Sequence, residues 1–197
     1  TFTADSSIAS DVLPSANFGD RANGRPPDMI VLHYTGMPDP EGAIARLCTA
    51  GTDVSAHYIV LEDGRIIQSV PEEARAWHAG AAFWAGEVDI NSCSIGIEII
   101  NRGHDWGYPE FPLRQIAAVI ALCRGIMLRR RVPSQRVLAH SDVAPTRTQD
   151  PGENFPCPSL ANSAVVHGVQ PAPTAPRPPP LPGPLRHCRP TTTPAPP

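Results

Sequence analysis

Three residues that lie far apart in the sequence have the side chains that a catalytic metal site needs. His140 and Asp150 both belong to the segment HSDVAPTRTQDPGENFP (His140–Pro156), whose prolines and glycine favour a defined loop. His33 stands near the end of the apolar run MIVLHYT. Two imidazoles and one carboxylate are a typical ligand set for zinc in a hydrolase, with a fourth position left for water. Because zinc lowers the pKa of that water toward ~7, we predict a hydrolytic zinc centre.

Glu98 is the candidate for a general base. It lies in the run SIGIEII (Ser94–Ile100), among isoleucines, where an unpaired carboxylate would be costly to bury. The alternation along this run places Glu98 on the less apolar face, which would suit the floor of a cleft or simply face solvent. A carboxylate with a raised pKa beside metal-bound water is what general-base catalysis needs.

Each of these residues also has an ordinary structural explanation. A lone histidine in a strand, such as His33, is more often a core or surface residue, and Asp150 before Pro-Gly suits a turn. His57, in a strand beside a tyrosine, is better explained by packing. His78 and Trp84, in the loop-like run RAWHAGAAFWAG, could contact a sugar or a peptide, or could pack and anchor the loop.

Apolar periodicity predicts the elements that position these residues. Strands are expected over 29–35, 94–100 and 136–141, a hairpin over 55–70, and helices over 39–51, 113–130 and 159–166. Residues 1–28 are rich in loop formers, which indicates an irregular arm. Strands that alternate with helices predict an α/β fold, and the hairpin makes its central sheet mixed. His33 and His140 would each lie at a strand end, where ligands of α/β folds commonly gather.

Composition indicates one domain followed by a different kind of segment. Residues 1–170 fit a single domain, whereas 12 of the 25 prolines lie within 171–197, which predicts a disordered or polyproline-like tail. Residues 1–170 hold 13 arginines against 19 acidic residues, so nucleic acid is not expected as a partner. The arginine run 129–131 suits the end of a helix and needs no ligand to explain it. No apolar run is long enough for a membrane span.

Cysteine usage and the first residues bear on the compartment. The five cysteines are odd in number and show no CxxC spacing, which favours free thiols over a disulfide framework. The first residues, TFTADSSIASDV, show neither a basic nor an apolar leader segment. We therefore expect a cytoplasmic protein and a monomer. A periplasmic location is the alternative if a leader has been removed, since the chain begins without methionine.

Several motifs occur together in a specific order: VLHYT, VSAHYIVLEDG, AWHAG, INSCSIGIEIIN, AHSDVAP and QDPGENFP. In this order they resemble the bacterial zinc-dependent N-acetylmuramoyl-L-alanine amidases of type 2. These enzymes are related to the phage lysozyme-type amidases and to the animal peptidoglycan recognition proteins. The resemblance runs from about Ser15 to Leu160. One motif alone would be weak, whereas the ordered set is highly specific.

The resemblance implies a mixed central sheet flanked by helices, a zinc cofactor and a peptidoglycan substrate. The bond cut would be the amide between the lactyl group of N-acetylmuramic acid and L-alanine, in peptidoglycan or its muropeptide fragments. Glu98 would polarise the attacking water. The implied zinc ligands are His33, His140 and Asp150. The implied groove residues are His78, Trp84 and Asn101.

One position departs from the family pattern. Bacterial members usually have a lysine two residues before the ligand aspartate, where this chain has Thr148. A hydroxyl can donate to an oxyanion but supplies no charge, and losing one such donor can cost about 100- to 1,000-fold in rate. The related recognition amidases resemble this chain in having threonine there, and Arg147 could also reach the substrate. Cys157 occupies a position where tryptophan is usual in the family. Its thiolate is a less favoured candidate for the third metal ligand than Asp150, which holds the family's ligand position.

Two other functions stay open on the sequence. A module of the same fold could hold muropeptides without cleaving them, because Thr148 replaces the lysine. An unrelated metallopeptidase is the second alternative, although the absence of HExxH argues against the common helical zinc motif. The retained ligands together with Glu98 favour an active amidase, since a binding module needs no such combination.

Overall fold

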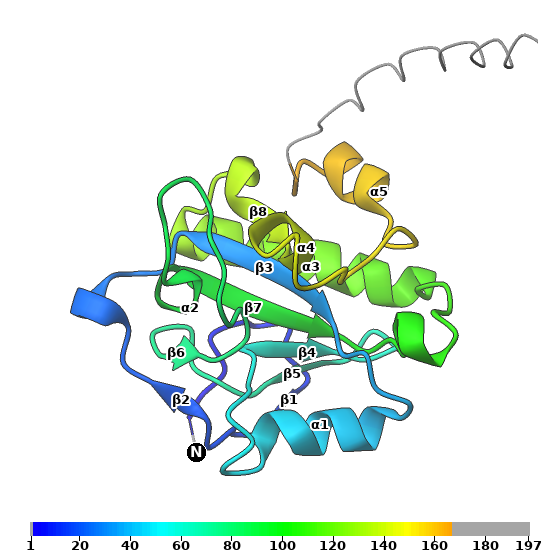
Figure 1. Ribbon diagram of the computed structural model, residues 1–197, viewed down its shortest axis with the longest axis horizontal. Helices are drawn as coiled ribbons and strands as arrows, with labels where there is room; N and C mark the ends of the chain where they lie inside the picture. The colour runs from blue at the N-terminus through cyan, green and yellow to red at the C-terminus, as the bar shows by residue number, and fades with distance from the viewer. Residues whose placement is uncertain (1, 167–197) are drawn as a thin grey trace, which may run out of the picture.

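The computed structural model describes residues 2–166 (Figure 1). The proline-rich tail predicted for 171–197 and the domain boundary at residue 170 lie outside the described residues. The strands are β1 (Asp11–Val12), β2 (Phe18–Gly19), β3 (Met29–Tyr34), β4 (Tyr58–Val60), β5 (Ile66–Gln68), β6 (Arg75–Ala76), β7 (Ser94–Ile99) and β8 (Val137–Ala139). The helices are α1 (Pro40–Cys48), α2 (Ile90–Cys93), α3 (Leu113–Arg130), α4 (His140–Val143) and α5 (Cys157–Asn162), with 3-10 turns at Ala22–Gly24, His104–Trp106 and Ser134–Arg136.

A six-stranded sheet with the order β1-β5-β4-β7-β3-β8 forms the centre of the fold. Only β4 and β5 pair antiparallel; the other neighbours in this sheet are parallel. The α/β class and the mixed sheet are therefore confirmed. β3 and β7 are interior strands with both faces covered, which explains why their sequences are almost continuously apolar.

Alternation along β7 separates the two faces of the sheet. Ile95, Ile97 and Ile99 belong to the largest core cluster, which also contains the apolar face of α3 and Leu160 of α5. The opposite face carries α1, whose Ala43 and Leu47 pack against Ile59 of β4 and Ile67 of β5. α2 and α4 contribute a third cluster with alternate residues of β3 and β8: Met29, Val31, Ile90, Cys93, Leu138 and Val143. The face with α1, α2 and α4 is also the face onto which His33 and Glu98 project.

Local signals explain where the predicted elements begin and turn. The side chain of Asp39 caps α1 by accepting from the backbone of Gly42 at 2.6 Å, and Pro40 occupies the first helical position. Between β4 and β5, Gly64 adopts a φ of 88°, the left-handed conformation that glycine supplies in a tight turn. The prediction of α3 over 113–130 is confirmed at both ends.

Four predictions were wrong in detail. The arm at 1–28 contains β1, which pairs with β5, and β2, which pairs with β6. The segment 75–86 begins with β6, and α2 precedes β7. His140 does not end a strand but begins α4, and the closing helix starts at Cys157 instead of Ser159. Strands and helices of two to four residues are too short to give a periodic pattern, and the short strands are defined by their long-range partners.

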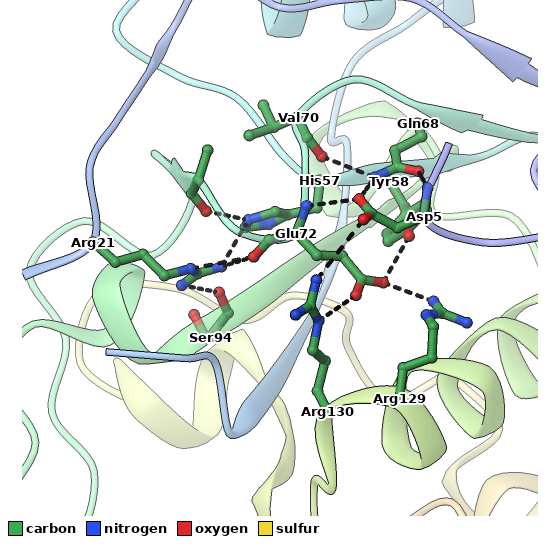
Figure 2. Close-up of polar contacts among 11 residues, drawn as sticks. Asp5, Arg21, His57, Tyr58, Gln68, Val70, Glu72, Ser94, Arg129 and Arg130 are labelled. Carbon is green, nitrogen blue, oxygen red and sulfur yellow. Dashed lines mark hydrogen bonds and ion pairs between the residues drawn. The ribbon is translucent and has the colours of Figure 1, made fainter. Parts of the chain in front are cut away.

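The arginine run at the end of α3 is used inside the fold. Figure 2 shows Arg129 and Arg130 around Glu72, whose two carboxylate oxygens lie 2.7 and 2.6 Å from them. The hydroxyl of Tyr58 donates to the same carboxylate at 2.7 Å. Asp5 accepts from the backbone of Glu72 at 2.9 Å, which ties the N-terminal arm to this cluster. The prediction that the run needs no ligand is in keeping with these contacts.

Two further predictions concern the described chain as a whole. The cysteines that the structure describes, Cys48, Cys93, Cys123 and Cys157, are free thiols, as expected. None of the helices within residues 2–166 has both the length and the apolar character that crossing a membrane requires.

Candidate metal centre

The three predicted metal ligands come together at one end of the sheet. His33 lies near the end of β3, His140 begins α4 directly after the neighbouring strand β8, and Asp150 lies in the loop after α4. Nδ1 of His33 is 3.0 Å from Oδ2 of Asp150, and Nδ1 of His140 is 3.1 Å from both carboxylate oxygens. All three side chains are buried, and their ligand atoms lie within 4.8 Å of one another. This triad could bind a metal ion.

The contacts of His140 are compatible with a role as metal ligand. Its Nε2 faces both the carbonyl oxygen of Ala79, at 3.0 Å, which can only accept, and Nη2 of Arg147, at 2.9 Å, which can only donate. When Nδ1 binds a metal, the proton lies on Nε2 and faces this carbonyl. Nδ1 then turns its lone pair toward the carboxylate of Asp150. Two electron-pair donors at about this distance repel unless a cation lies between them, and an imidazole and a carboxylate are both ligands that zinc prefers.

The charge states of the ligands agree with metal binding. Burial lowers the pKa of His33, which keeps the imidazole neutral, as a ligand must be. Burial opposes ionisation of Asp150, but its contacts with His140 and His33 outweigh burial and hold the pKa of its carboxyl well below the usual range. A neutral imidazole of His33 and an ionised carboxylate of Asp150 are therefore available together.

Glu98 lies beside the triad on the neighbouring strand. β3 and β7 are parallel and pair His33 with Glu98 in register. Burial, and after it the charge of Asp150, raises the pKa of Glu98 well above its usual value. Its Oε2 is buried and has no hydrogen-bond partner among residues 2–166. The carboxylate lines a cavity of about 100 Å³ with Thr35, Met37, Ala43, Arg46, Leu47 and Val54.

Thr148 and Arg147 lie on different sides of the triad. The hydroxyl of Thr148 donates to Oδ1 of Asp150, so it is directly beside the ligand carboxylate. Arg147 is bound to the loop at 79–81: its Nε donates to the carbonyl of Ala81 at 3.2 Å, and its Nη2 donates to that of Ala79. Nη2 is also 2.9 Å from Nε2 of His140, the nitrogen that points away from Asp150. Of the two, Thr148 is the one placed at the ligand carboxylate.

The residues predicted to line a substrate groove have other contacts in the structure. His78 lies behind His33, with its Nδ1 3.0 Å from Nε2 of His33. Trp84 is half-buried, packs on the cluster of α2 and α4, and pairs through its backbone with Glu87. The side chain of Asn101 donates to the carbonyl of Pro109 and accepts from the backbone of Gly103. A role in substrate binding stays a prediction for all three residues.

Two features of the site were not predicted. Oδ1 of Asn91 accepts from the backbone N–H groups of His78 and Ala79, at 3.1 and 2.8 Å, and so fixes the loop behind the histidines. In the sequence this asparagine only precedes a strand, which is no signal for such a role. His104 stacks on Tyr108 at 4.2 Å between ring centres, and the hydroxyl of Tyr108 donates to the carbonyl of Pro151. This stack supports the loop that carries Asp150.

Comparisons with known proteins agree with the site. Residues 23–153 match the family described as N-acetylmuramoyl-L-alanine amidase. The amidase AmiD of Escherichia coli (strain K12) is 38% identical over 149 residues, which cover 70% of this chain and 53% of AmiD. AmpD of Citrobacter freundii, a 1,6-anhydro-N-acetylmuramyl-L-alanine amidase, is 31% identical over 161 residues, covering 73% of this chain and 83% of AmpD.

A solved structure extends the likeness to the fold. The complex of E. coli AmiD with the substrate anhydro-N-acetylmuramic acid-L-Ala-D-gamma-Glu-L-Lys has a TM-score of 0.66 and 36% identity, and it covers 72% of this chain and 59% of that chain. This chain thus spans about half the length of AmiD and most of the length of AmpD. Sequence, fold and metal triad agree, and the chain belongs to the N-acetylmuramoyl-L-alanine amidase family.

Proposed function

We propose that the protein is a zinc-dependent hydrolase of the amide bond between the lactyl group of N-acetylmuramic acid and L-alanine in muropeptides. The observation that supports this most directly is the buried triad of His33, His140 and Asp150 with the unpartnered carboxylate of Glu98 in register beside it. Ligands and base are the two parts that metal-assisted amide hydrolysis requires.

Zinc is the metal that the donor set favours. Two imidazoles and a carboxylate match the three-ligand pattern of catalytic zinc sites. A zinc ion bound here would polarise the scissile carbonyl and lower the pKa of a water molecule toward ~7. The triad residues would hold it, with His33 from β3, His140 from α4 and Asp150 from the loop between α4 and α5.

Glu98 and Thr148 have separate roles in this proposal. Glu98 accepts a proton from the attacking water and returns it to the leaving amine of L-alanine, for which a raised pKa suits it. Thr148 contacts Asp150 and is the nearest neutral donor to the ligand carboxylate. With substrate bound, its single hydroxyl proton would turn from Asp150 to the oxyanion and stabilise it without a charge, as a substitute for the lysine of other bacterial members.

The substrate class follows from the relatives. The AmiD complex holds an anhydro-muropeptide, and AmpD is named for the same 1,6-anhydro linkage. Released muropeptides, including the anhydro form, are therefore the proposed substrates. The cytoplasmic location and the monomeric state expected from the sequence stay predictions.

The test uses the 197-residue chain, loaded with zinc, and two substrates. One is a muropeptide with the stem L-Ala-D-γ-Glu followed by a diamino acid, and the other is its 1,6-anhydro form. Mass spectrometry should show a free stem peptide that begins with L-alanine, and a chelator should abolish its release until zinc is restored. Binding without release in a zinc-replete sample would show a recognition module instead. Cleavage between two amino acids would show a peptidase.

A further inference from the structure

The outer nitrogen of His33 lies at the start of a chain of hydrogen bonds whose direction can be deduced. Nε2 of His33 is 3.0 Å from Nδ1 of His78, and Nε2 of His78 is 3.2 Å from the hydroxyl of Ser94. The Ser94 hydroxyl in turn lies within hydrogen-bond distance of the carbonyl of Ile90. A carbonyl can only accept, so the single proton of Ser94 points to Ile90.

The position of the Ser94 proton determines which ring nitrogens of His78 and His33 carry hydrogen when both imidazoles are neutral. Because the Ser94 proton is used, its oxygen accepts from Nε2 of His78, which therefore carries a hydrogen. In the neutral imidazole, a hydrogen on Nε2 leaves a lone pair on Nδ1. That lone pair accepts from Nε2 of His33, and Nδ1 of His33 is left with its lone pair facing Asp150.

The outer nitrogen of His140 is contacted in a similar way by Ala79, the next residue of the same loop. Nε2 of His140 faces the carbonyl of Ala79, with Nη2 of Arg147 also nearby, and a hydrogen on Nε2 leaves the lone pair of its Nδ1 toward Asp150. Consecutive residues thus provide the outer partners of both ligand histidines, one through a side chain and one through the backbone. We propose that the segment His78–Ala79 is a positioning clamp that sets the tautomer of both imidazoles for the metal.

Two other residues hold this clamp in place. Asn91 is buried and accepts from the backbone N–H groups of both clamp residues. On the other side, His78 packs directly over Gly96 of β7. A Cβ added at Gly96 would lie 2.5 Å from Cγ of His78, so only glycine leaves room for the ring. His78 is therefore a positioning residue behind the metal, which differs from the groove contact predicted for it.

This inference rests on the proposed zinc function and makes a claim that can be tested apart from catalysis. Outer partners orient ligand histidines and raise their basicity, and their loss typically costs ~10- to 100-fold in metal affinity. His78→Phe keeps an aromatic ring but removes the acceptor. His78→Asn keeps an acceptor atom close to the position of Nδ1. We expect His78→Phe to bind zinc ~10- to 100-fold more weakly, and His78→Asn to recover most of the loss.

Zinc affinity is measured by competition with a chromophoric chelator, and the ligand field by the visible spectrum of the cobalt-substituted protein. Glu62→Gln is the control, because Glu62 is an exposed side chain in the β4–β5 turn and takes no part in the site. Gly96→Ala is the second variant: it leaves His78 unchanged but displaces its ring, and should shift the cobalt spectrum in the same direction. Unchanged affinity and spectrum in both His78→Phe and Gly96→Ala would overturn the proposal.

Nitrogen-15 NMR of the zinc-loaded, unmodified protein gives a test that depends on no variant. His33, His78 and His140 should each show a proton on Nε2 and none on Nδ1. A proton on Nδ1 of His78 would overturn the clamp. So would His140 protonated on Nδ1, as expected if Arg147 donates to its Nε2. If the unmodified protein binds no zinc at all, the proposed function fails instead, and the two failures are distinguishable.

Discussion

His33 and Glu98 are paired in register on the adjacent parallel strands β3 and β7, both interior strands of the sheet. The first metal ligand and the candidate base are therefore placed by the same ladder of backbone hydrogen bonds. Their separation does not depend on any loop. His140 and Asp150, by contrast, are brought in by α4 and the loop that follows it. The base should keep its place when the metal is removed.

Replacing Glu98 should separate catalysis from metal binding. Glu98→Gln keeps the shape of the side chain but cannot take a proton, so kcat should fall by about 100- to 10,000-fold. Zinc content should stay at one ion per chain, since Glu98 is not among the three ligands. Glu62→Gln, at an exposed acid in the β4–β5 turn, is the control and should change neither quantity. Full activity in Glu98→Gln would exclude Glu98 as the base.

Replacing a zinc-ligating residue should abolish the stabilisation that zinc binding gives to the folded protein. A ligand that binds only the folded state stabilises it by RT ln(1 + [L]/Kd), about 2.7 kcal/mol when zinc is at 100 times its Kd. A chelator should therefore lower the melting temperature of the unmodified protein. In His33→Ala the chelator should have no effect, because zinc is no longer bound. Metal analysis and differential scanning calorimetry provide the two readouts. Full zinc content in His33→Ala would refute its assignment as a ligand.

Replacing Thr148 should change the turnover number more than it changes zinc binding. Thr148→Val keeps the shape but removes the hydroxyl that donates to Asp150, and kcat should fall by about 100-fold if this hydroxyl serves the oxyanion. Thr148→Lys adds a charged donor and should raise kcat above that of the unmodified enzyme. Both are measured at saturating zinc, with zinc content as the control. Equal turnover in all three proteins would show that the oxyanion is stabilised elsewhere.

Much of this site could be predicted because its parts have local signals. β3, β7 and α3 are long and periodic, and the turn at Asp63-Gly64 has its own chemistry, so these elements and the mixed sheet follow from the sequence. Residue types suggest the triad, and the family resemblance is needed to assign it, since His33 and Asp150 each also have an ordinary structural explanation. The clamp is different, since Ala79 acts through its carbonyl and Asn91 through contacts with a distant loop. Backbone acceptors have no signature in a sequence, and neither do β1 and β2, which are defined only by their partners.

Glu72 should make stability depend on acid pH. Burial alone raises the pKa of this fully buried carboxyl, but hydrogen bonds from Arg129, Arg130 and Tyr58 outweigh burial, and the net pKa lies below the ordinary 4.5. A carboxyl with a lowered pKa in the folded state binds fewer protons than in the unfolded chain. It therefore stabilises the fold above about pH 4.5, and this stabilisation is lost as the pH falls through the folded-state pKa.

Glu72→Gln removes this charge and tests the predicted direction of the pH dependence of stability. At pH 7 the variant should lose about 2 kcal/mol in free energy of unfolding, less than the 3–5 kcal/mol of a fully buried pair, because both arginines remain partly exposed. The difference from the unmodified protein should shrink as the pH is lowered below 4.5. Urea unfolding at several pH values between about 3 and 7 measures it. The exposed neighbour Glu73, changed to Gln, is the matched control and should show no such pH-dependent difference. A difference that stays constant from pH 7 to pH 3 would mean that packing, and not the carboxylate charge, accounts for the contribution of Glu72.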